Sequence, residues 1–291
     1  LTTATVAENP KLISFVPLTI EYRERTYAAG KIPGGFFKRE TRPRDKETLY
    51  ARMTDRPIRP CFPKGWNHET MVYTLVISSD CKNDAGPLSI TGGSAALLLS
   101  DAPFTEPVSG VRIGLLKDEF VLFPTMEERA ELDMELVVAG KKGAILMVEG
   151  GAKEVPEEKL LKALELAQAE IDKLCELQLR LVAEARKAGR APVKYAVVPP
   201  EFPEPVKTFV TGKALDPIRK ALHHGYKHKH GIAEQIKPLK ESLVAEVIEK
   251  AKTDPAFAGQ EVHVGPILSE IKGEEGRAMI VHERVRPDGR R

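Results

Sequence analysis

A proline-rich stretch between two differently patterned regions constrains the fold of this chain more than any other feature. Residues 189–205 contain five prolines and follow a long amphipathic segment at 157–187. Because proline fixes one backbone angle and lacks an amide hydrogen, such stretches commonly connect domains. Strand and helix patterns alternate before it, whereas only helical patterns follow it. The sequence therefore predicts an α/β (α+β) domain over 1–189 and an all-helical domain over 190–283.

Periodicity predicts the individual elements. Asp45 is a plausible N-cap of a helix that Pro57 and Pro60 would end. Gly92–Ser94 predicts a turn before a buried helix, and Gly189 ends the long helix of the first region. Alternating apolar residues predict strands, and apolar steps of three and four predict helices. The expected strands are 1–7, 15–21, 71–78, 111–116, 119–123, 135–139 and 144–149, and the expected helices of the second region are 217–228, 233–252 and 264–281.

Composition excludes some classes of protein. The 44 Lys and Arg residues nearly balance the 42 Asp and Glu residues, so the net charge of +2 points to no partner. The three cysteines are scattered and form no CxxC pair, which favours a reducing compartment such as the cytoplasm. The longest apolar runs, 95–99 and 144–148, are much shorter than the roughly 20 residues that cross a bilayer. We therefore expect no membrane partner.

Positive charge is nevertheless concentrated in residues 21–64. This segment holds twelve Lys and Arg residues against six Asp and Glu residues, whereas 117–135 holds two against seven. A local cationic surface attracts polyanions and releases their condensed counterions. Candidate polyanion-binding residues are therefore expected within 21–64.

An aromatic and basic loop lies inside this segment. Phe36 and Phe37 are followed directly by Lys38 and Arg39, in a stretch rich in glycine and proline that Arg42 continues. Aromatic rings stack on unpaired bases and cations pair with phosphates, which is the chemistry of single-strand binding. Alternatively, the two phenylalanines pack into the core and the cations are solvated. The residues alone leave both interpretations open.

A row of arginines follows on the next predicted helix. Arg52, Arg56 and Arg59 recur at steps of four and three, so they share one helical face. Three guanidinium groups on one face need anions between them, and RNA phosphates would satisfy them. A structural salt-bridge network that includes Asp55 is the alternative.

Four other patterns are weaker candidates for sites. Gly92–Ser94 could hold phosphate at a helix N-terminus, but small residues more often permit close packing. The histidine cluster 223–230 places His224 and His228 four residues apart, although neighbouring lysines disfavour a metal and favour a solvated surface. Acidic residues between 127 and 135 could bind Mg²⁺ or form a solvated turn. The cysteines have no paired histidine motif, so a structural role is favoured for them.

Several ordered segments resemble one family. The resemblance is to the polynucleotide phosphorylase (polyribonucleotide nucleotidyltransferase) family, and its segments occur here in the same order: 15–40, 47–60, 62–65, 93–97, 136–140 and 285–290. It implies a ribonuclease PH-like domain over 1–189 that lacks its first strands, and a helical linker domain over 190–283. It also implies that 284–291 begins a second, truncated ribonuclease PH-like domain.

The resemblance implies an activity as well. Members of this family perform phosphorolysis, in which inorganic phosphate attacks the 3′-terminal phosphodiester of single-stranded RNA and releases a nucleoside 5′-diphosphate; the reverse reaction polymerises diphosphates. Their serine-rich phosphate loop, acid-x-lysine motif and Mg²⁺ belong to the second domain. In this sequence, residues 83–89 contain no serine run, and Val137 stands where a lysine would follow Glu135. We therefore expect no catalytic and no metal-binding residue in this chain.

The same resemblance assigns RNA handling to this part of the protein. Loop 36–39 corresponds to the loop that grips RNA in the central channel of a ring-shaped homotrimer. The helix that carries Arg52, Arg56 and Arg59 corresponds to one that contacts phosphate. The implied partners are single-stranded RNA, further copies of the chain and other RNA-decay proteins. A non-catalytic RNA-binding or scaffold fragment is the alternative function.

Overall fold

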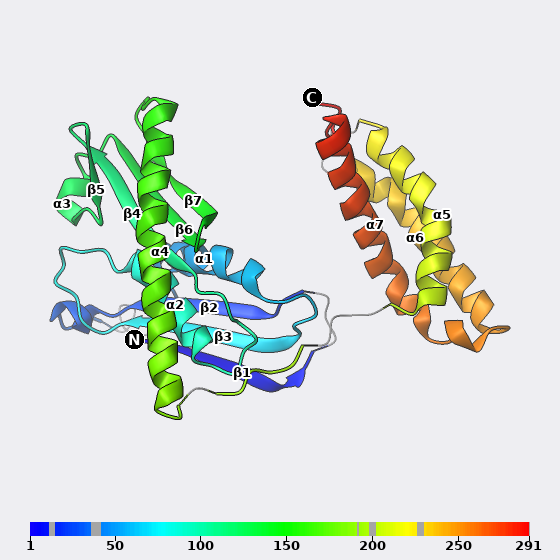
Figure 1. Ribbon diagram of the computed structural model, residues 1–291, viewed down its shortest axis with the longest axis horizontal. Coiled ribbons are helices and arrows are strands. Elements are labelled where there is room, and N and C mark those ends of the chain that lie inside the picture. The colour runs from blue at the N-terminus through cyan, green and yellow to red at the C-terminus, as the bar shows by residue number, and fades with distance from the viewer. Residues whose placement is uncertain (12–14, 36–41, 191, 198–201, 226–229, 291) are drawn as a thin grey trace. The chain divides into compact units, whose positions relative to one another are not determined.

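The computed structural model describes residues 1–291 except 12–14, 36–41, 191, 198–201, 226–229 and 291 (Figure 1). The chain divides into two compact units, 1–199 and 200–291. Each unit has a hydrophobic core of its own. Within the described residues, no helix combines the length and the apolar character that a membrane span requires.

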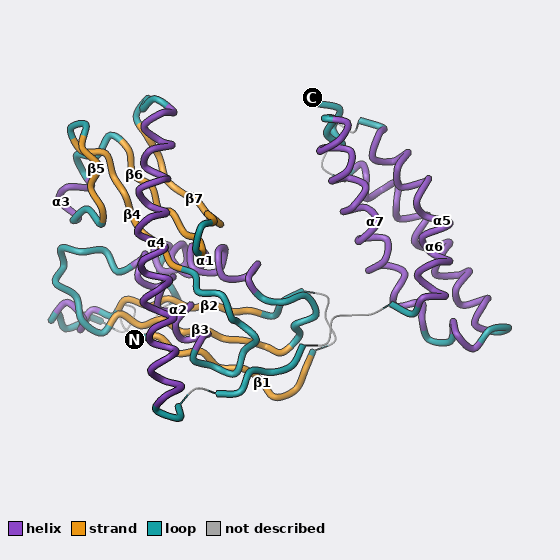
Figure 2. Tube along the Cα trace, in the orientation of Figure 1, coloured by secondary structure: helices purple, strands orange, loops and turns teal. Residues whose placement is uncertain are grey.

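The first unit contains two small sheets, drawn in orange in Figure 2. One has the order β1-β3-β2, with β1 (Thr2–Pro10) antiparallel and β2 (Leu18–Glu24) parallel to β3 (His68–Val76). A parallel pair requires a crossover, and helix α1 (Asp45–Ile58) supplies it. The other sheet is antiparallel and has the order β5-β4-β6-β7, with β4 at Ser109–Leu116, β5 at Glu119–Leu122, β6 at Met134–Lys141 and β7 at Ala144–Ala152.

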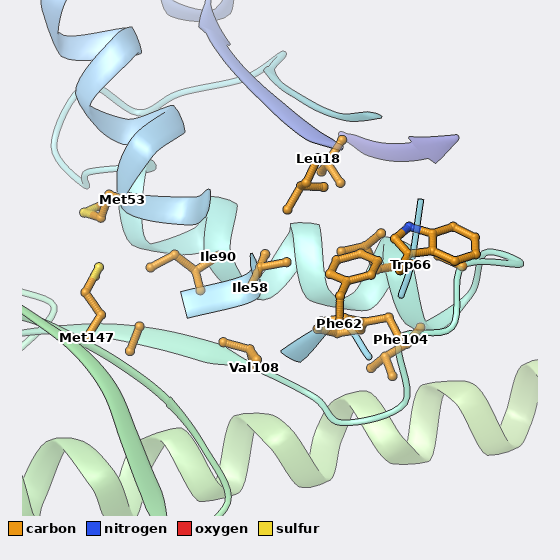
Figure 3. Packing of buried hydrophobic residues seen from close by; sticks show 14 of the residues in the cluster. Leu18, Met53, Ile58, Phe62, Trp66, Ile90, Phe104, Val108 and Met147 are labelled. Carbon is orange, nitrogen blue, oxygen red and sulfur yellow. The ribbon is translucent and has the colours of Figure 1, made fainter. Parts of the chain in front are cut away.

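Helix α2 (Gly86–Leu98) lies between the two sheets, because it contacts β1 and β3 on one side and β4 on the other. Its buried Ile90 belongs to the same apolar cluster as Leu18 of β2 and Ile58 of α1 (Figure 3). Close approach depends on a missing side chain: a Cβ at Gly93 would lie 3.3 Å from Cδ1 of Ile58. This cluster joins both sheets into one unit.

Helix α4 (Glu157–Lys187) covers the four-stranded sheet. Its buried residues recur at steps of about four, which forms one apolar stripe against Val111, Ile113 and Leu115 of β4. Leu177 and Leu181 of the same helix lie off this stripe and are about half exposed. The buried residues of the helix are Ala163, Ala167, Ile171, Cys175, Gln178 and Val182.

The chain beyond α4 still belongs to the first unit. The Lys194 ammonium donates hydrogen bonds to the carbonyl oxygens of Leu97, Leu98 and Ser100 at 2.9, 2.9 and 2.7 Å. Tyr195 packs against the core of the unit. These contacts hold part of the proline-rich stretch against the end of α2.

The described residues of the second unit form helices and no strands. The three long helices are α5 (Glu204–His223), α6 (Gly231–Ala251) and α7 (Val264–Ala278). Shorter turns of helix follow α6 and α7, at Pro255–Phe257, Gln260–His263 and Met279–Glu283. Buried aliphatic residues from all three long helices meet in one cluster, which includes Val210, Ile218, Leu243, Val247, Ile267 and Ile271.

The structure corrects several predicted boundaries. Arg44, not Asp45, is the N-cap of α1, whereas that helix ends at Ile58, between Pro57 and Pro60, as predicted. Gly92–Ser94 is not a turn before a helix but the middle of α2. Helix α5 begins well before the predicted start at 217, so Pro217 also lies within a helix. Glycine and proline were therefore weaker breaks than the sequence suggested, because burial of the helices outweighs their cost.

Candidate nucleic-acid interface

The predicted aromatic and basic loop lies largely outside the described residues. Phe36, Phe37, Lys38 and Arg39 fall within 36–41, so their RNA-binding role stays a prediction. Arg42 is described and exposed, and it lines a cavity of about 1060 Å³. The cavity therefore marks the part of the predicted interface that the structure describes.

Four segments of the first unit surround this cavity: the end of β2, a short 3-10 helix η1 (Thr26–Ala29), the start of α1, and the loop before α2. Its charged lining is mainly positive. Three carboxylates, those of Glu24, Glu47 and Asp84, face it together with six cations, which are Arg23, Arg25, Lys31, Arg42, Arg44 and Lys46. The local excess of positive charge predicted for 21–64 is thus gathered around one hollow.

The carboxylates neutralise the cations nearest to α1. Lys46 and Arg44 lie 3.0 and 3.5 Å from carboxylate oxygens of Glu24. Glu47 is buried and accepts hydrogen bonds from the backbone amides of Arg44 and Glu24, both at 2.8 Å. Burial alone would raise the pKa of Glu47, but these amide bonds outweigh it and lower the pKa. This arrangement fixes the start of α1 at the edge of the cavity.

Two cations of the lining are left without such a partner. The Lys31 ammonium and the Arg42 guanidinium make no hydrogen bond or ion pair with other described residues. Both side chains belong to exposed residues. No described residue therefore competes with an anionic ligand for their charges.

The three arginines predicted to share one helical face, Arg52, Arg56 and Arg59, have three different environments. Arg59 is structural: it forms two bonds to the Asp55 carboxylate, at 2.7 and 2.9 Å, and donates to the carbonyl oxygens of Val16 and Leu18 at 2.7 and 2.9 Å. Arg56 pairs with Glu149 of β7 at 2.8 Å, and both side chains are more than half exposed. Arg52 is exposed and has no ion pair within the described part of the chain.

A cluster of buried charges lies beside α1, between the loop before α2 and the four-stranded sheet. We call Tyr50, Asp84, Arg112, Arg129 and Glu135 the ion cluster. Arg112 bonds to both acids, at 2.6 Å to Asp84 and through a second short bond to Glu135. Arg129 also bonds to both, at 2.7 Å to Glu135 and 3.3 Å to Asp84. Two guanidinium groups thus neutralise two carboxylates.

Burial makes this cluster costly to disrupt. The side chains of Asp84 and Arg112 are only 3% and 6% exposed. Burial alone would raise the pKa of Asp84, but the hydrogen bond from Tyr50 and the charge of Arg112 outweigh it, so that pKa is lowered. Burial and the bond that it donates to Asp84, 2.5 Å long, raise the pKa of Tyr50 to about 12. Asp84 therefore remains ionised and Tyr50 neutral near neutral pH.

Comparison with known proteins gives the family. Residues 1–103 match domain 1 of the 3′ exoribonuclease family, and residues 106–170 match domain 2 of the same family. The chain belongs to the 3′ exoribonuclease family. Its first unit is therefore a ribonuclease PH-like α/β structure, as the resemblance implied.

Curated relatives agree with this family membership. The polyribonucleotide nucleotidyltransferases of Gemmatimonas aurantiaca, Thermus thermophilus and Bacillus subtilis are 42%, 41% and 40% identical over 100% of this chain. The aligned region covers 38%, 40% and 40% of these relatives. The chain thus spans about two fifths of the length of the curated relatives that it matches.

The ion cluster lies where the resemblance aligned this chain with catalytic segments. Asp84 belongs to segment 83–89 and Glu135 to the acid-x-Val motif, the two segments that the resemblance aligned with catalytic elements of the second domain. The fold brings these two segments together, but arginine side chains occupy both carboxylates. Among the described residues, no group of three or more His, Cys, Asp or Glu could hold a metal ion. These residues therefore do not fit a Mg²⁺ site.

The sequence analysis did not identify Arg112 and Arg129, the two arginines that neutralise these carboxylates. Arg112 lies in a strand whose other residues are nearly all buried, and a charged residue in such a strand indicates a buried counter-charge. Its partners lie 28 and 23 positions away along the chain, so only the fold reveals them. Arg129 appeared merely as a basic residue among acids.

The weaker candidates have mainly structural surroundings. Ser94 accepts a buried hydrogen bond from the amide of Val108 at 2.8 Å, and the glycines before it pack within α2, which supports the packing interpretation. His223 bonds to the Arg219 carbonyl and to Glu283, both at 2.8 Å, whereas His228 lies outside the described residues. In the acidic stretch, Glu128 caps the short helix α3 (Met126–Arg129). Cys175 is buried under the four-stranded sheet, as expected for a structural thiol.

Proposed function

We propose that this chain is the N-terminal, RNA-guiding part of a phosphorolytic 3′→5′ exoribonuclease. The whole protein would degrade single-stranded RNA to nucleoside 5′-diphosphates, and in reverse would polymerise RNA from diphosphates. Membership in the 3′ exoribonuclease family and the named relatives support this proposal. Because the chain spans only about two fifths of those relatives, the activity belongs to the longer protein.

One observation supports a guiding rather than a catalytic role: the ion cluster. A phosphorolytic site must leave cations free for the attacking phosphate and carboxylates free for a metal. In the ion cluster, Arg112 and Arg129 are bonded to Asp84 and Glu135, so neither charge is available. The cations without a partner among the described residues lie instead along the cavity and on α1, where Lys31, Arg42 and Arg52 can contact phosphates of the strand.

The proposal places catalysis in the remaining length of the protein. There, inorganic phosphate is the co-substrate and Mg²⁺ supplies charge neutralisation at the reacting phosphate. The second unit acts as an all-helical linker domain, and 284–291 begins the second ribonuclease PH-like domain. Three copies would form a ring with loop 36–39 and Arg42 toward its channel. We place the protein in the cytoplasm, where other RNA-decay proteins are candidate partners.

Phosphorolysis of poly(A) tests this division of labour. The 291-residue chain and the longer protein are each incubated with poly(A), with and without inorganic phosphate, and released ADP is measured by chromatography. We expect phosphate-dependent ADP from the longer protein only, while the 291-residue chain still binds a labelled oligo(A). Phosphate-dependent ADP release by the 291-residue chain would show that the proposed role is wrong.

The predicted loop can be tested in the longer protein. Replacing Phe36 and Phe37 together by alanine should weaken single-strand binding by about 1–3 kcal/mol for each base that loses its stacking partner. Unchanged affinity in the assembled enzyme would remove the stacking role of the loop.

A further inference from the structure

The cavity beside Arg42 has an aromatic side chain that the proposed function does not yet use. Tyr27 lines the cavity and is 55% exposed. Its hydroxyl forms no hydrogen bond with other described residues. An exposed tyrosine ring in a cavity that is also lined by cations resembles the surfaces on which unpaired bases stack.

The short helix η1 holds this ring outward. Ala28 is buried, and its carbonyl accepts a hydrogen bond from the Ser79 amide at 2.8 Å. Gly30 ends η1 at a φ of +68°, a conformation that favours glycine, and its amide bonds to the Tyr27 carbonyl at 3.0 Å. With one neighbour packed inside and the turn closed behind it, the backbone of Tyr27 is fixed. Less entropy is lost when a fixed platform binds a ligand.

The size and charge of the cavity fit a nucleotide. Its volume of about 1060 Å³ is slightly larger than the roughly 300–1,000 Å³ typical of small-ligand sites, so a nucleotide has room in it. Lys31 and Arg42 line it without a counter-charge among the described residues, so they can pair with phosphate oxygens. Arg44 and Lys46, which also line the cavity, are already paired with Glu24.

We infer that this cavity holds an unpaired nucleotide of an RNA strand, with its base stacked on Tyr27 and its phosphates paired with Lys31 and Arg42. The inference rests on the proposed function, because it takes single-stranded RNA as the ligand. It adds a binding position outside loop 36–39 and α1. A duplex would bind less well, because paired bases do not expose their faces to the ring.

The main test measures the affinity of the 291-residue chain for a fluorescein-labelled single-stranded oligo(A) by anisotropy. Tyr27→Ala should weaken binding by about 5- to 150-fold, the range that loss of one stacked base produces. Tyr27→Phe keeps the ring and loses only the hydroxyl, so its affinity should stay within about twofold of the parent chain. Circular dichroism and thermal unfolding of each variant establish that it is folded.

A second pair of variants tests the phosphate contacts. Lys31→Gln combined with Arg42→Gln should make the dependence of log affinity on log salt shallower by about two. Lys173→Gln combined with Lys187→Gln removes the same charge from α4, where both ammonium groups already pair with glutamates. This control should leave the slope nearly unchanged. Equal slopes for both pairs would contradict local phosphate contacts.

An exposed cysteine reports directly on occupancy. Cys81 lines the cavity, whereas Cys61 is partly buried and Cys175 is buried. Bound oligo(A) should slow alkylation of Cys81 by N-ethylmaleimide at least several-fold and leave the other two thiols unaffected. If free AMP protects Cys81 as well as oligo(A) at equal nucleotide concentration, the cavity takes a mononucleotide and the strand inference is wrong.

These outcomes separate the inference from the proposed function. If oligo(A) binds but Tyr27→Ala and Cys81 protection show no effect, the cavity is not a strand site, while the guiding role can still rest on other residues. If the parent chain does not bind oligo(A) at all, both the inference and the guiding role are wrong.

Discussion

The ion cluster and the cavity lie in the same unit, and both include residues of the loop before α2. They differ in how far the protein itself neutralises their cations. In the ion cluster, two guanidinium groups bond to two carboxylates, the buried one of Asp84 and the partly buried one of Glu135. Around the cavity, six cations face three carboxylates, and Lys31 and Arg42 have no described partner. The number of charges in a region therefore says little about ligand binding. The decisive property is whether the protein supplies its own counter-charges.

The ion cluster should be the more sensitive region for stability. Arg112→Met removes the main counter-charge of Asp84, whose side chain is only 3% exposed. Because breaking a buried pair leaves an uncompensated charge, the free energy of unfolding should fall by about 3–5 kcal/mol. Urea denaturation measures this change.

Arg129→Met is the matched control for that variant. The Arg129 side chain is 23% exposed and lies farther from Asp84, at 3.3 Å. Its loss should cost clearly less, because water reaches this side of the cluster. Equal losses for the two variants, or a loss below about 1 kcal/mol for Arg112→Met, would contradict a closed and internally neutralised cluster.

Acid should weaken the ion cluster. The pKa of Asp84 in the folded chain is lowered below its ordinary value of 3.8. The stabilisation from its charge is therefore complete above about pH 4 and is lost as the pH falls through the folded-state pKa. Each unit of pKa difference corresponds to about 1.4 kcal/mol.

Unfolding measured from pH 6 down to pH 2 checks this dependence. Asp84→Asn should be less stable than the parent chain at pH 6 and should lose less stability toward pH 2, so the two curves converge. Parallel curves would mean that the Asp84 charge does not stabilise the fold.

The same contrast exists between Arg52, within α1, and Arg59, which directly follows the last residue of that helix. Arg59→Ala leaves the Val16 and Leu18 carbonyls and Asp55 without their donor, so stability should fall by about 1–3 kcal/mol. Arg52→Ala should change stability by no more than about 0.5 kcal/mol, because its exposed side chain has no described ion pair. Thermal unfolding of both variants measures these two changes in stability. Similar losses would show that the row acts as one network, the alternative left open by the sequence.

The sequence predicted those parts of the fold that depend on local periodicity. β4, β6 and α4 lie within a few residues of their predicted ranges, because each has a strong repeat of its own. Pro217 and Gly92–Ser94 were misjudged, since a packed helix tolerates residues that would end an exposed one. Tertiary packing determines whether the helix continues through these residues, and local sequence patterns do not reveal that packing.

The candidate site was predictable in composition but not in arrangement. The excess of cations in 21–64 was visible, and Arg42 indeed lines the cavity. The sequence does not show that Tyr27 is exposed while Tyr22, five positions earlier, is buried. The pairing of Asp84 with Arg112 joins residues that only the fold brings together. Exposure and pairing, rather than residue type, distinguish a ligand contact from a structural one.

The smallest expected effect concerns RNA binding by Arg52 and Arg56, which differ only in their surroundings. Arg52→Gln should lower the slope of log oligo(A) affinity against log salt by about one, because a free cation that neutralises a phosphate releases one counterion. Arg56→Gln should change the slope less, since the Glu149 carboxylate lies 2.8 Å from the Arg56 guanidinium and competes with phosphate. Anisotropy titrations at several salt concentrations measure both slopes. If Arg56→Gln has the larger effect, phosphate displaces the Glu149 carboxylate from Arg56. An exposed counter-charge would then not prevent an arginine from binding phosphate, in contrast to the carboxylates of the ion cluster.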